Sequence, residues 1–375
     1  MLRKSRKYLL LLTGLLALAY FFYRFRDAIA LEGFHWATVA ESLHHARLSL
    51  LLLSVAAIYV CFALRALRWM RLCRWLGPAR FWNVYNATLM GFSCTFLLGR
   101  AAEPIRPVLI ARKDSLSMPG MFGVYVLERV FDMAATALLA GFALLLFEHQ
   151  GLPGGPSGPL MRVARSAGVL LLAGIVGAVV FLVYFRYHGA GWLSRKLRES
   201  AWRHGWRGKV VLLLEGFIEG LQGIRTWSDL GLLSFYTAAH WLLIALIYLW
   251  VAHAFPGRLA GLSFAGATLV LALTAVGSAL QLPGVGGGAQ VATFLVLTLI
   301  FGVEKEPAAT ASIVLWLVTF ASCSLAGLPL LFREGWSMAE LRRMATKEEQ
   351  AGEAELLADA ERAAELSGPS KERPQ

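Results

Sequence analysis

Three charged residues and two prolines interrupt an apolar stretch at residues 94–113, CTFLLGRAAEPIRPVLIARK. The charges are Arg100, Glu103 and Arg106. Because unsatisfied backbone groups are costly in hydrocarbon, a helix that breaks at membrane depth must be buried in protein or line a watery cavity. Glu103 can neutralise one arginine and leave the other to hold an anion, since a guanidinium offers a planar fork matched to phosphate. The alternative is an ordinary cytoplasmic loop with anchoring arginines.

A second group of charges lies in the stretch VLERVFDMAATALLAGF, within a predicted helix over 121–147. Glu128 and Asp132 are four residues apart and share a helix face, and Arg129 is three residues from Asp132. Ionisable side chains this deep are expensive and usually face a polar interior or a partner. We therefore favour a functional role, in which Arg129 pairs with one carboxylate and the other meets a proton, a cationic headgroup or the first motif's arginines. A self-neutralising structural cluster is the alternative.

A glycine-rich break, LQLPGVGGGAQ, is the third motif. No strand is predicted before it and no Gly-Lys-Ser/Thr follows it, which argues against a nucleotide-binding loop. Proline and clustered glycines instead end one helix and free backbone N–H groups at the start of the next, which is a natural anion site. A simple flexible turn is the alternative. The candidate binding residues here are Pro283, Gly284, Gly286, Gly287 and Gln290.

Other residue patterns point away from catalysis. The eight histidines show no HExxH or other ligand pair, and we interpret His240 as a satisfied interior histidine. The four cysteines lack metal-type spacing and are predicted to be small buried hydrophobes, so we expect no cofactor or metal. Four arginines at three-residue spacing are interpreted as an anchor to anionic lipids of the inner leaflet: Arg65, Arg68, Arg71 and Arg74.

The elements that must position these motifs are membrane helices. The 375 residues are 57% hydrophobic and only 16% charged, whereas a soluble domain usually has about a quarter charged residues. We expect an all-α polytopic membrane protein with about eight transmembrane helices plus re-entrant or interrupted segments. Two interrupted regions are predicted at 81–118 and 262–303. Uninterrupted spans are predicted at 8–23, 48–64, 121–147, 167–187, 230–255 and 308–332.

The net charge of +12 is distributed as in a membrane protein, not as in a nucleic-acid-binding protein. Its cations gather between apolar segments, and the positive-inside rule places such clusters in the cytoplasm. We therefore expect a multi-pass protein of the bacterial cytoplasmic (inner) membrane with both termini cytoplasmic. The N-terminus is similar to a signal peptide, but aromatic and charged residues at 21–27 make a poor cleavage region. Residues 8–23 are thus predicted to be a retained helix.

The two interrupted regions share one pattern, in which small and apolar residues run into a glycine or proline break and then resume. Basic residues on both sides of 81–111 predict a hairpin that enters and leaves on one side, with arms at 81–98 and 105–111. Region 262–303 is either two full crossings or a hairpin from the opposite side. Paired breaks in corresponding halves are typical of inverted-repeat transporters. Residues 1–335 are expected to form this membrane domain, and 336–375 a charged, partly disordered cytoplasmic tail.

At these motifs the chain resembles the lysylphosphatidylglycerol synthase transmembrane-region family, also described as flippase-like integral membrane proteins. The family's Arg-x-Gly-Glu-x-x-Arg signature is matched, with Ala102 in place of the glycine, by Arg100, Glu103 and Arg106. Its Glu-Arg-x-x-Asp element is matched by Glu128, Arg129 and Asp132. Its late Pro-Gly-rich element is matched by Pro283, Gly284, Gly286 and Gly287. Ala289 and Gln290 stand where that element often ends in an acid.

The resemblance implies a helical bundle with re-entrant segments that moves lipids or lipid-linked intermediates across the cytoplasmic membrane. We expect no soluble aminoacyl-transfer domain and no aminoacylation. Our leading hypothesis is a lipid transporter, or flippase, that binds the anionic or zwitterionic headgroup of a phospholipid or polyprenyl-linked lipid between the three motifs. The alternatives are a membrane-embedded lipid-modifying transferase, with Glu128 or Asp132 as base, and a non-transporting scaffold.

Overall fold

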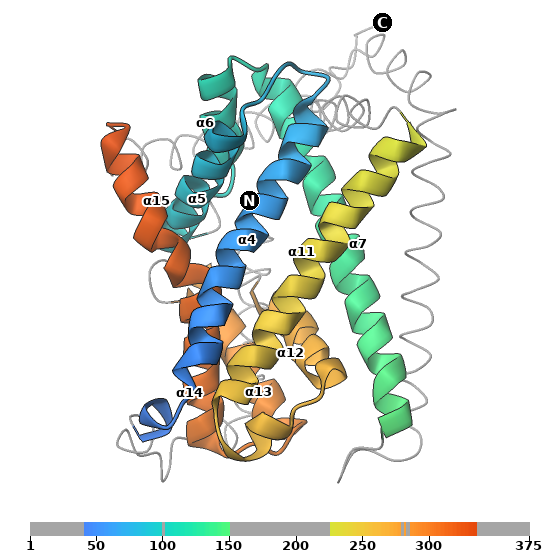
Figure 1. The fold of residues 1–375 in the computed structure, drawn as a ribbon, viewed down its shortest axis with the longest axis vertical. Coiled ribbons are helices and arrows are strands. Elements are labelled where there is room, and N and C mark those ends of the chain that lie inside the picture. The colour runs from blue at the N-terminus through green and yellow to red at the C-terminus, as the bar shows by residue number, and fades with distance from the viewer. Residues whose placement is uncertain (1–40, 100–101, 151–225, 279–280, 283–285, 336–375) are drawn as a thin grey trace, which may run out of the picture.

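The computed structural model describes residues 41–99, 102–150, 226–278, 281–282 and 286–335 (Figure 1). These residues form a bundle of helices with one two-residue strand pair. Its long helices are α4 (Leu48–Cys73), α7 (Met118–Gln150), α11 (Trp227–Ala254), and α14 (Lys305–Trp316), which continues through the π-helical turn η4 (Leu317–Ala321) into α15 (Ser322–Arg333). The predicted all-α fold is confirmed for this part of the chain.

Several long helices have the length and the apolar surface of membrane spans. Within the described ranges, three helices are long and apolar enough to cross a bilayer: Leu48–Cys73, Trp227–Ala254 and Lys305–Arg333. Large apolar side chains such as Leu52, Phe235 and Leu325 are exposed on these helices. Extensive exposed apolar surface of this kind marks contact with a membrane or a partner. The predicted spans at 8–23 and 167–187 and the tail at 336–375 lie outside the described residues.

α4 is longer than predicted, because it continues past the predicted end at residue 64 to Cys73. The prediction placed the helix end at the first charge, Arg65. Apolar residues keep helical spacing beyond that charge, and Ala66, Trp69 and Leu72 are buried. Arg65 therefore lies inside the bundle and not in a basic loop on the membrane surface.

The first interrupted region forms a hairpin of two helices, α5 (Phe81–Leu98) and α6 (Ile105–Asp114), close to the predicted arms. Gly99 ends α5 with a φ of 79°, which favours glycine because other residues strain there. Asn83, near the start of α5, donates a 2.6 Å hydrogen bond to Asp114 at the end of α6. The chain thus returns to the end of the bundle from which it entered the hairpin.

The second interrupted region also forms a hairpin, of α12 (Phe264–Gly277) and α13 (Gly288–Leu299). With 14 and 12 residues, both helices are shorter than the roughly 20 residues that a full crossing needs. The region therefore consists of two short helices, and a re-entrant hairpin stays a prediction. Between the helices, β1 (Gln281–Leu282) and β2 (Gly286–Gly287) pair antiparallel.

The two halves of the described bundle pack in one pattern. α4 and α11, the first long helix of each half, pack against each other. α5 packs against α15 and α12 packs against α7, so each hairpin contacts the last long helix of the other half. The hairpins lie at opposite ends of the bundle (Figure 1), and each is surrounded by its own buried apolar core.

Close packing of α15 on α5 depends on Gly327, because a Cβ at this position would overlap Ser93 Oγ and the Leu89 carbonyl oxygen. We expect Gly327→Ala to lower the melting temperature of detergent-purified protein, since overpacking costs about 1–3 kcal/mol. Gly231→Ala in α11 is the matched control, because a Cβ there meets no atom within 4 Å. Equal melting temperatures for the two variants would contradict this packing.

Candidate functional site

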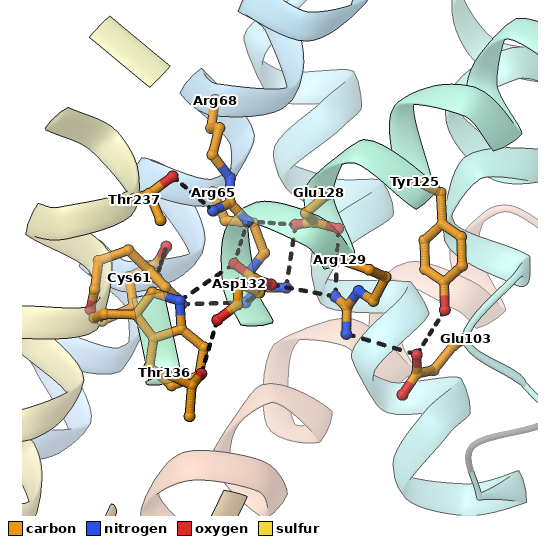
Figure 2. A network of polar contacts seen from close by, with 12 residues as sticks. Cys61, Arg65, Arg68, Glu103, Tyr125, Glu128, Arg129, Asp132, Thr136 and Thr237 are labelled. Carbon is orange, nitrogen blue, oxygen red and sulfur yellow. Dashed lines mark hydrogen bonds and ion pairs between the residues drawn. The ribbon is translucent and has the colours of Figure 1, made fainter. Parts of the chain in front are cut away.

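Two charged stripes on neighbouring helices face each other inside the bundle (Figure 2). α4 contributes Arg65 and Arg68, three residues apart, and α7 contributes Glu128 and Asp132, four residues apart. Residues at these spacings lie on one face of a helix. Because α4 packs against α7, the two stripes meet, and all four side chains are buried.

The two arginines of α4 bridge both carboxylates of α7. Arg68 Nη2 lies 2.9 Å from Glu128 Oε1 and 2.8 Å from Asp132 Oδ1. Arg65 Nη1 lies 3.2 Å from Glu128 Oε1, and Arg65 Nη2 lies 3.3 Å from Asp132 Oδ2. The interpretation of Arg65 and Arg68 as surface anchors for lipid is therefore wrong, because carboxylates of the protein neutralise them in the interior.

Arg106 joins the same cluster from α6. Its guanidinium forms an ion pair with Glu128 and lies over the Trp69 ring, 4.5 Å from the ring centroid. Gly91 of α5 leaves room for this side chain, because a Cβ at Gly91 would overlap Arg106. Arg106 is thus bound to a carboxylate of α7. The first motif predicted that one of its two arginines is left for an anion, and the other of them, Arg100, lies outside the described residues.

Glu103 and Arg129 form the partly exposed rim of the cluster. Glu103 accepts a 2.7 Å hydrogen bond from the Tyr125 hydroxyl, and Arg129 Nη1 lies 3.7 Å from Glu103 Oε2. The Arg129 side chain, 35% exposed, also lies 3.4 Å from Glu128 Oε2 and 3.5 Å from Asp132 Oδ2. Among the described residues, Glu103 neutralises Arg129 of α7, and Arg100 of the hairpin lies outside them.

α11 adds polar partners that the sequence motifs did not include. Arg68 Nη1 donates a 3.0 Å hydrogen bond to Thr237 Oγ1. Trp241 Nε1 donates a 3.2 Å hydrogen bond to Asp132 Oδ1. Thr237 and Trp241 are four residues apart and so share the face of α11 that packs on α4.

His240 lies on the same face of α11 and contacts α4 with both ring nitrogens. Its Nδ1 lies 3.3 Å from the Cys61 carbonyl oxygen, and its Nε2 lies 3.1 Å from Arg65 Nη2. A carbonyl only accepts and a guanidinium only donates, so these contacts require a neutral imidazole with its proton on Nδ1. The prediction of a satisfied interior histidine is confirmed.

The cluster carries one more positive than negative charge. Its four guanidinium groups and three carboxylates belong to Arg65, Arg68, Arg106, Arg129, Glu103, Glu128 and Asp132. Removing charges from water is costly unless each has close partners of opposite sign. The surplus guanidinium charge suits the cluster to an anionic ligand such as a phosphate group.

A cavity of about 180 Å³ opens beside Arg65. Helices α4, α5, α11, α12, α13 and α14 and the turn η4 all contribute to its wall, so it reaches from the charge cluster to the second hairpin. Its aromatic lining residues are Phe62, Phe92, Trp241, Tyr248, Trp316 and Phe320. Gln290 of the third motif also lines it, whereas the other described members of the predicted site do not.

The third motif is described only in part. Pro283 and Gly284 lie outside the described residues, as does Arg100 of the first motif. Gly286 and Gly287 form β2, and Gln290 Oε1 accepts a hydrogen bond from the Gly287 backbone N–H. The first and second motifs are therefore in direct contact through ion pairs. The third motif lies across the cavity from them, where Gln290 is part of the wall.

Arg65 and Arg68 are the main residues that sequence reasoning assigned to the wrong role. The signal that could have found them is complementary spacing: two arginines three apart on one helix and two acids, Glu128 and Asp132, four apart on another. In the described ranges no group of three or more His, Cys, Asp or Glu residues could hold a metal ion. The four cysteines are free and buried, as predicted.

Glu128 is the central acceptor of the cluster, because three buried arginines contact it. We expect Glu128→Gln to destabilise the protein by roughly 3–5 kcal/mol, since it leaves buried guanidinium groups uncompensated. Glu334→Gln is the matched control, because Glu334 pairs with Lys113 in an exposed position, where such a pair contributes about 0–1 kcal/mol. Thermal unfolding in detergent compares the two variants. Similar melting temperatures would contradict the central role of Glu128.

Comparison with curated proteins and with solved structures found no match to this chain. The family described as "Lysylphosphatidylglycerol synthase TM region" matches residues 9–327, which include the charge cluster and both hairpins. The chain therefore belongs to the lysylphosphatidylglycerol synthase transmembrane-region family, as its motifs predicted.

Proposed function

We propose that this protein moves a lipid across the cytoplasmic membrane and binds the lipid headgroup beside the buried arginines. Its family is one of membrane proteins related to lipid handling. The observation that carries the proposal is the cavity next to Arg65, which joins a net positive cluster to a broken-helix hairpin. Ionisable side chains inside a membrane bundle mark substrate pathways, because only a polar interior can accept a polar headgroup.

The depth of the cavity supports this function. Ile58 and Arg65 line it from α4, about 15 and 25 Å along a helix of about 39 Å. His240 and Ile244 line it from the middle turns of α11. Substrate sites of secondary transporters lie near the bilayer midplane, at the interface between repeats.

The packing of the two hairpins supports an inverted repeat. Among the described elements, each hairpin follows one long helix, precedes another and contacts the last long helix of the other half. The hairpins lie at opposite ends of the bundle (Figure 1). We interpret them as re-entrant segments that enter the membrane from opposite sides, which would let the cavity open to one side at a time.

The basic residues support the proposed orientation in the membrane. They gather where α4, α6 and α15 end: Arg74, Arg80, Arg112, Lys113 and Arg333. These three helix ends lie at one end of the bundle (Figure 1). By the positive-inside rule this end faces the cytoplasm, with both chain termini on the same side.

The carboxylates are poorly placed for the alternative of a transferase. A general base needs a free lone pair directed at its substrate. Both carboxylate oxygens of Glu128 and of Asp132 instead contact guanidinium groups. We therefore favour transport without chemical change of the lipid.

Transport is tested with purified protein in vesicles that contain headgroup-labelled lipid. A quencher added outside the vesicles measures the rate at which labelled lipid reaches the outer leaflet. We expect Arg65→Gln to slow translocation about tenfold or more, because a hydrogen bond to a charged group contributes roughly 1.5–3 kcal/mol. Arg74→Gln, which replaces an exposed arginine of the same helix end, is the matched control. Mass spectrometry of the recovered lipid shows whether it is unchanged. A modified lipid would favour the transferase.

A second test blocks the cavity with a substitution that changes no charge. Ala275 lines the cavity from α12, and we expect Ala275→Trp to abolish translocation because the larger side chain fills the headgroup space. Ala238→Trp, at an exposed position of α11, is the matched control. Wild-type rates for a correctly folded Ala275→Trp protein would rule out the cavity as the path of the headgroup.

A further inference from the structure

The last long helix of the described bundle is interrupted halfway by an irregular turn. α14, η4 and α15 together span Lys305–Arg333, 29 residues. In η4 the Ser322 backbone N–H donates to the Leu317 carbonyl, five residues back, whereas an α-helix bonds four residues back. A π-helical turn of this kind contains one residue more than an α-helical turn. Helices bend at such interruptions of the hydrogen-bond ladder.

The two parts of this helix are held by different hairpins. α14 packs against α13 of the second hairpin, and α15 packs against α5 of the first (Figure 1). Val314 and Leu315 of α14 are buried in the apolar core around the second hairpin, and Leu331 of α15 is buried in the core around the first. The irregular turn therefore connects two separately packed parts of the described bundle.

Hydroxyl groups at the turn bind neighbouring backbone carbonyls of the same helix. Thr319 Oγ1 donates to the Leu315 carbonyl at 2.6 Å, and Ser322 Oγ donates to the Val318 carbonyl. Inside a membrane, a backbone group that loses its helical partner needs another, because no water is there to replace it. Serine and threonine hydroxyls at this spacing often accompany bent helices. A change of bend at η4 would thus leave these carbonyls with a hydrogen-bond donor.

Hydroxyl groups of two other helices reach the first residues of α15. The Tyr59 hydroxyl of α4 donates to the Ser322 carbonyl at 2.7 Å. Ser93 Oγ of α5 lies 3.3 Å from the Cys323 carbonyl oxygen and 2.8 Å from the Leu89 carbonyl oxygen, so its single proton serves both. The Tyr59 hydrogen bond stabilises the described position of α15 relative to α4.

η4 also forms part of the cavity wall. Thr319 and Phe320 of this turn line the cavity. The centroid of the Phe320 ring lies 6.3 Å from that of the Phe92 ring, which lines the cavity from α5. A change of bend at η4 would move Phe320 relative to Phe92 and so change the width of the cavity.

We propose that η4 is a hinge, about which α14 and the second hairpin change their angle to α15 and the first hairpin. The Tyr59 hydroxyl stabilises the described position, and the hydroxyls of Thr319 and Ser322 keep their carbonyls bonded as the angle changes. This inference rests on the proposed function for its purpose, because movement of one repeat against the other opens a midplane site to alternate sides. The movement itself is measured without a lipid substrate.

The hinge movement is measured as the distance between two spin labels, by double electron–electron resonance of purified protein in vesicles. Leu299→Cys in α13 and Phe332→Cys in α15 place the labels at exposed positions on either side of η4. The four native cysteines are buried, which disfavours their labelling. We expect two distance populations in this labelled parent protein, because α13 and α15 belong to the two parts that η4 connects.

Deletion of Leu317 removes the hinge. Leu317 is exposed, so its deletion returns η4 to a regular α-helical turn without removing a buried side chain. We expect this variant to melt close to the parent temperature, to show one distance population and to translocate no labelled lipid.

Two controls separate the hinge from damage to the helix. Deletion of Ile313, an exposed residue in the regular part of α14, turns the rest of the helix by about 100° and is expected to prevent folding. Pro329→Ala removes a different irregularity from the same helix. Leu328 and Leu331, on either side of Pro329, pack in the same apolar core, so we expect two distance populations and unchanged translocation.

Tyr59→Phe tests the hinge without a deletion. It removes the donor to the Ser322 carbonyl, and we expect it to shift the ratio of the two populations about fivefold away from the described one, the effect of one hydrogen bond. Tyr236→Phe in α11 is the matched control. Tyr236 lies beside Arg71 at the end of α4, about three helical turns from Tyr59.

Each outcome decides for or against the hinge. A single population in the parent protein overturns it, as does undiminished translocation by a folded protein that lacks Leu317. If the deletion prevents folding, an unchanged population ratio in Tyr59→Phe overturns the hinge, and a shifted ratio supports it. Two populations that merge on deletion of Leu317, in a parent protein that translocates no lipid, support the hinge and overturn the transporter.

Discussion

Burial of guanidinium groups inside an apolar helix bundle is the constraint on which this structure depends. Arg65, Arg68 and Arg106 are all buried, and each reaches Glu128. A charge that deep is tolerated only with close partners. The acidic stripe of α7 must therefore lie between α4 and α6, and this requirement positions the first hairpin against the long helices.

The pairing of arginines with carboxylates also explains how the bundle can be apolar on its surface and charged in its interior. On α4, residues up to Phe62 belong to one buried apolar core, and residues from Ala66 onward belong to another. The charge cluster lies at the boundary between these cores. The polar layer therefore lies between two apolar regions of the described bundle.

The cavity gives that polar layer a role. Its wall combines a charged helix face, aromatic rings and the π-helical turn η4, which contributes Thr319 and Phe320. Such turns occur often at functional sites, because the extra residue redirects side chains. In the proposed function, a headgroup in this cavity would contact polar groups while its acyl chains remain among apolar side chains.

The sequence by itself determined the all-helical fold of the described residues, the arms of the first hairpin and the burial of Glu128 and Asp132 in a polar interior. These features could be predicted because apolar periodicity, glycine breaks and charges within apolar segments are patterns of a few neighbouring residues. Only the tertiary structure decided which charges are partners: Arg68 and Glu128 are 60 residues apart, and no local pattern links them. The sequence also predicted that the helix ends at Arg65, because the charge of Arg65 is visible in the sequence but its buried carboxylate partners are not.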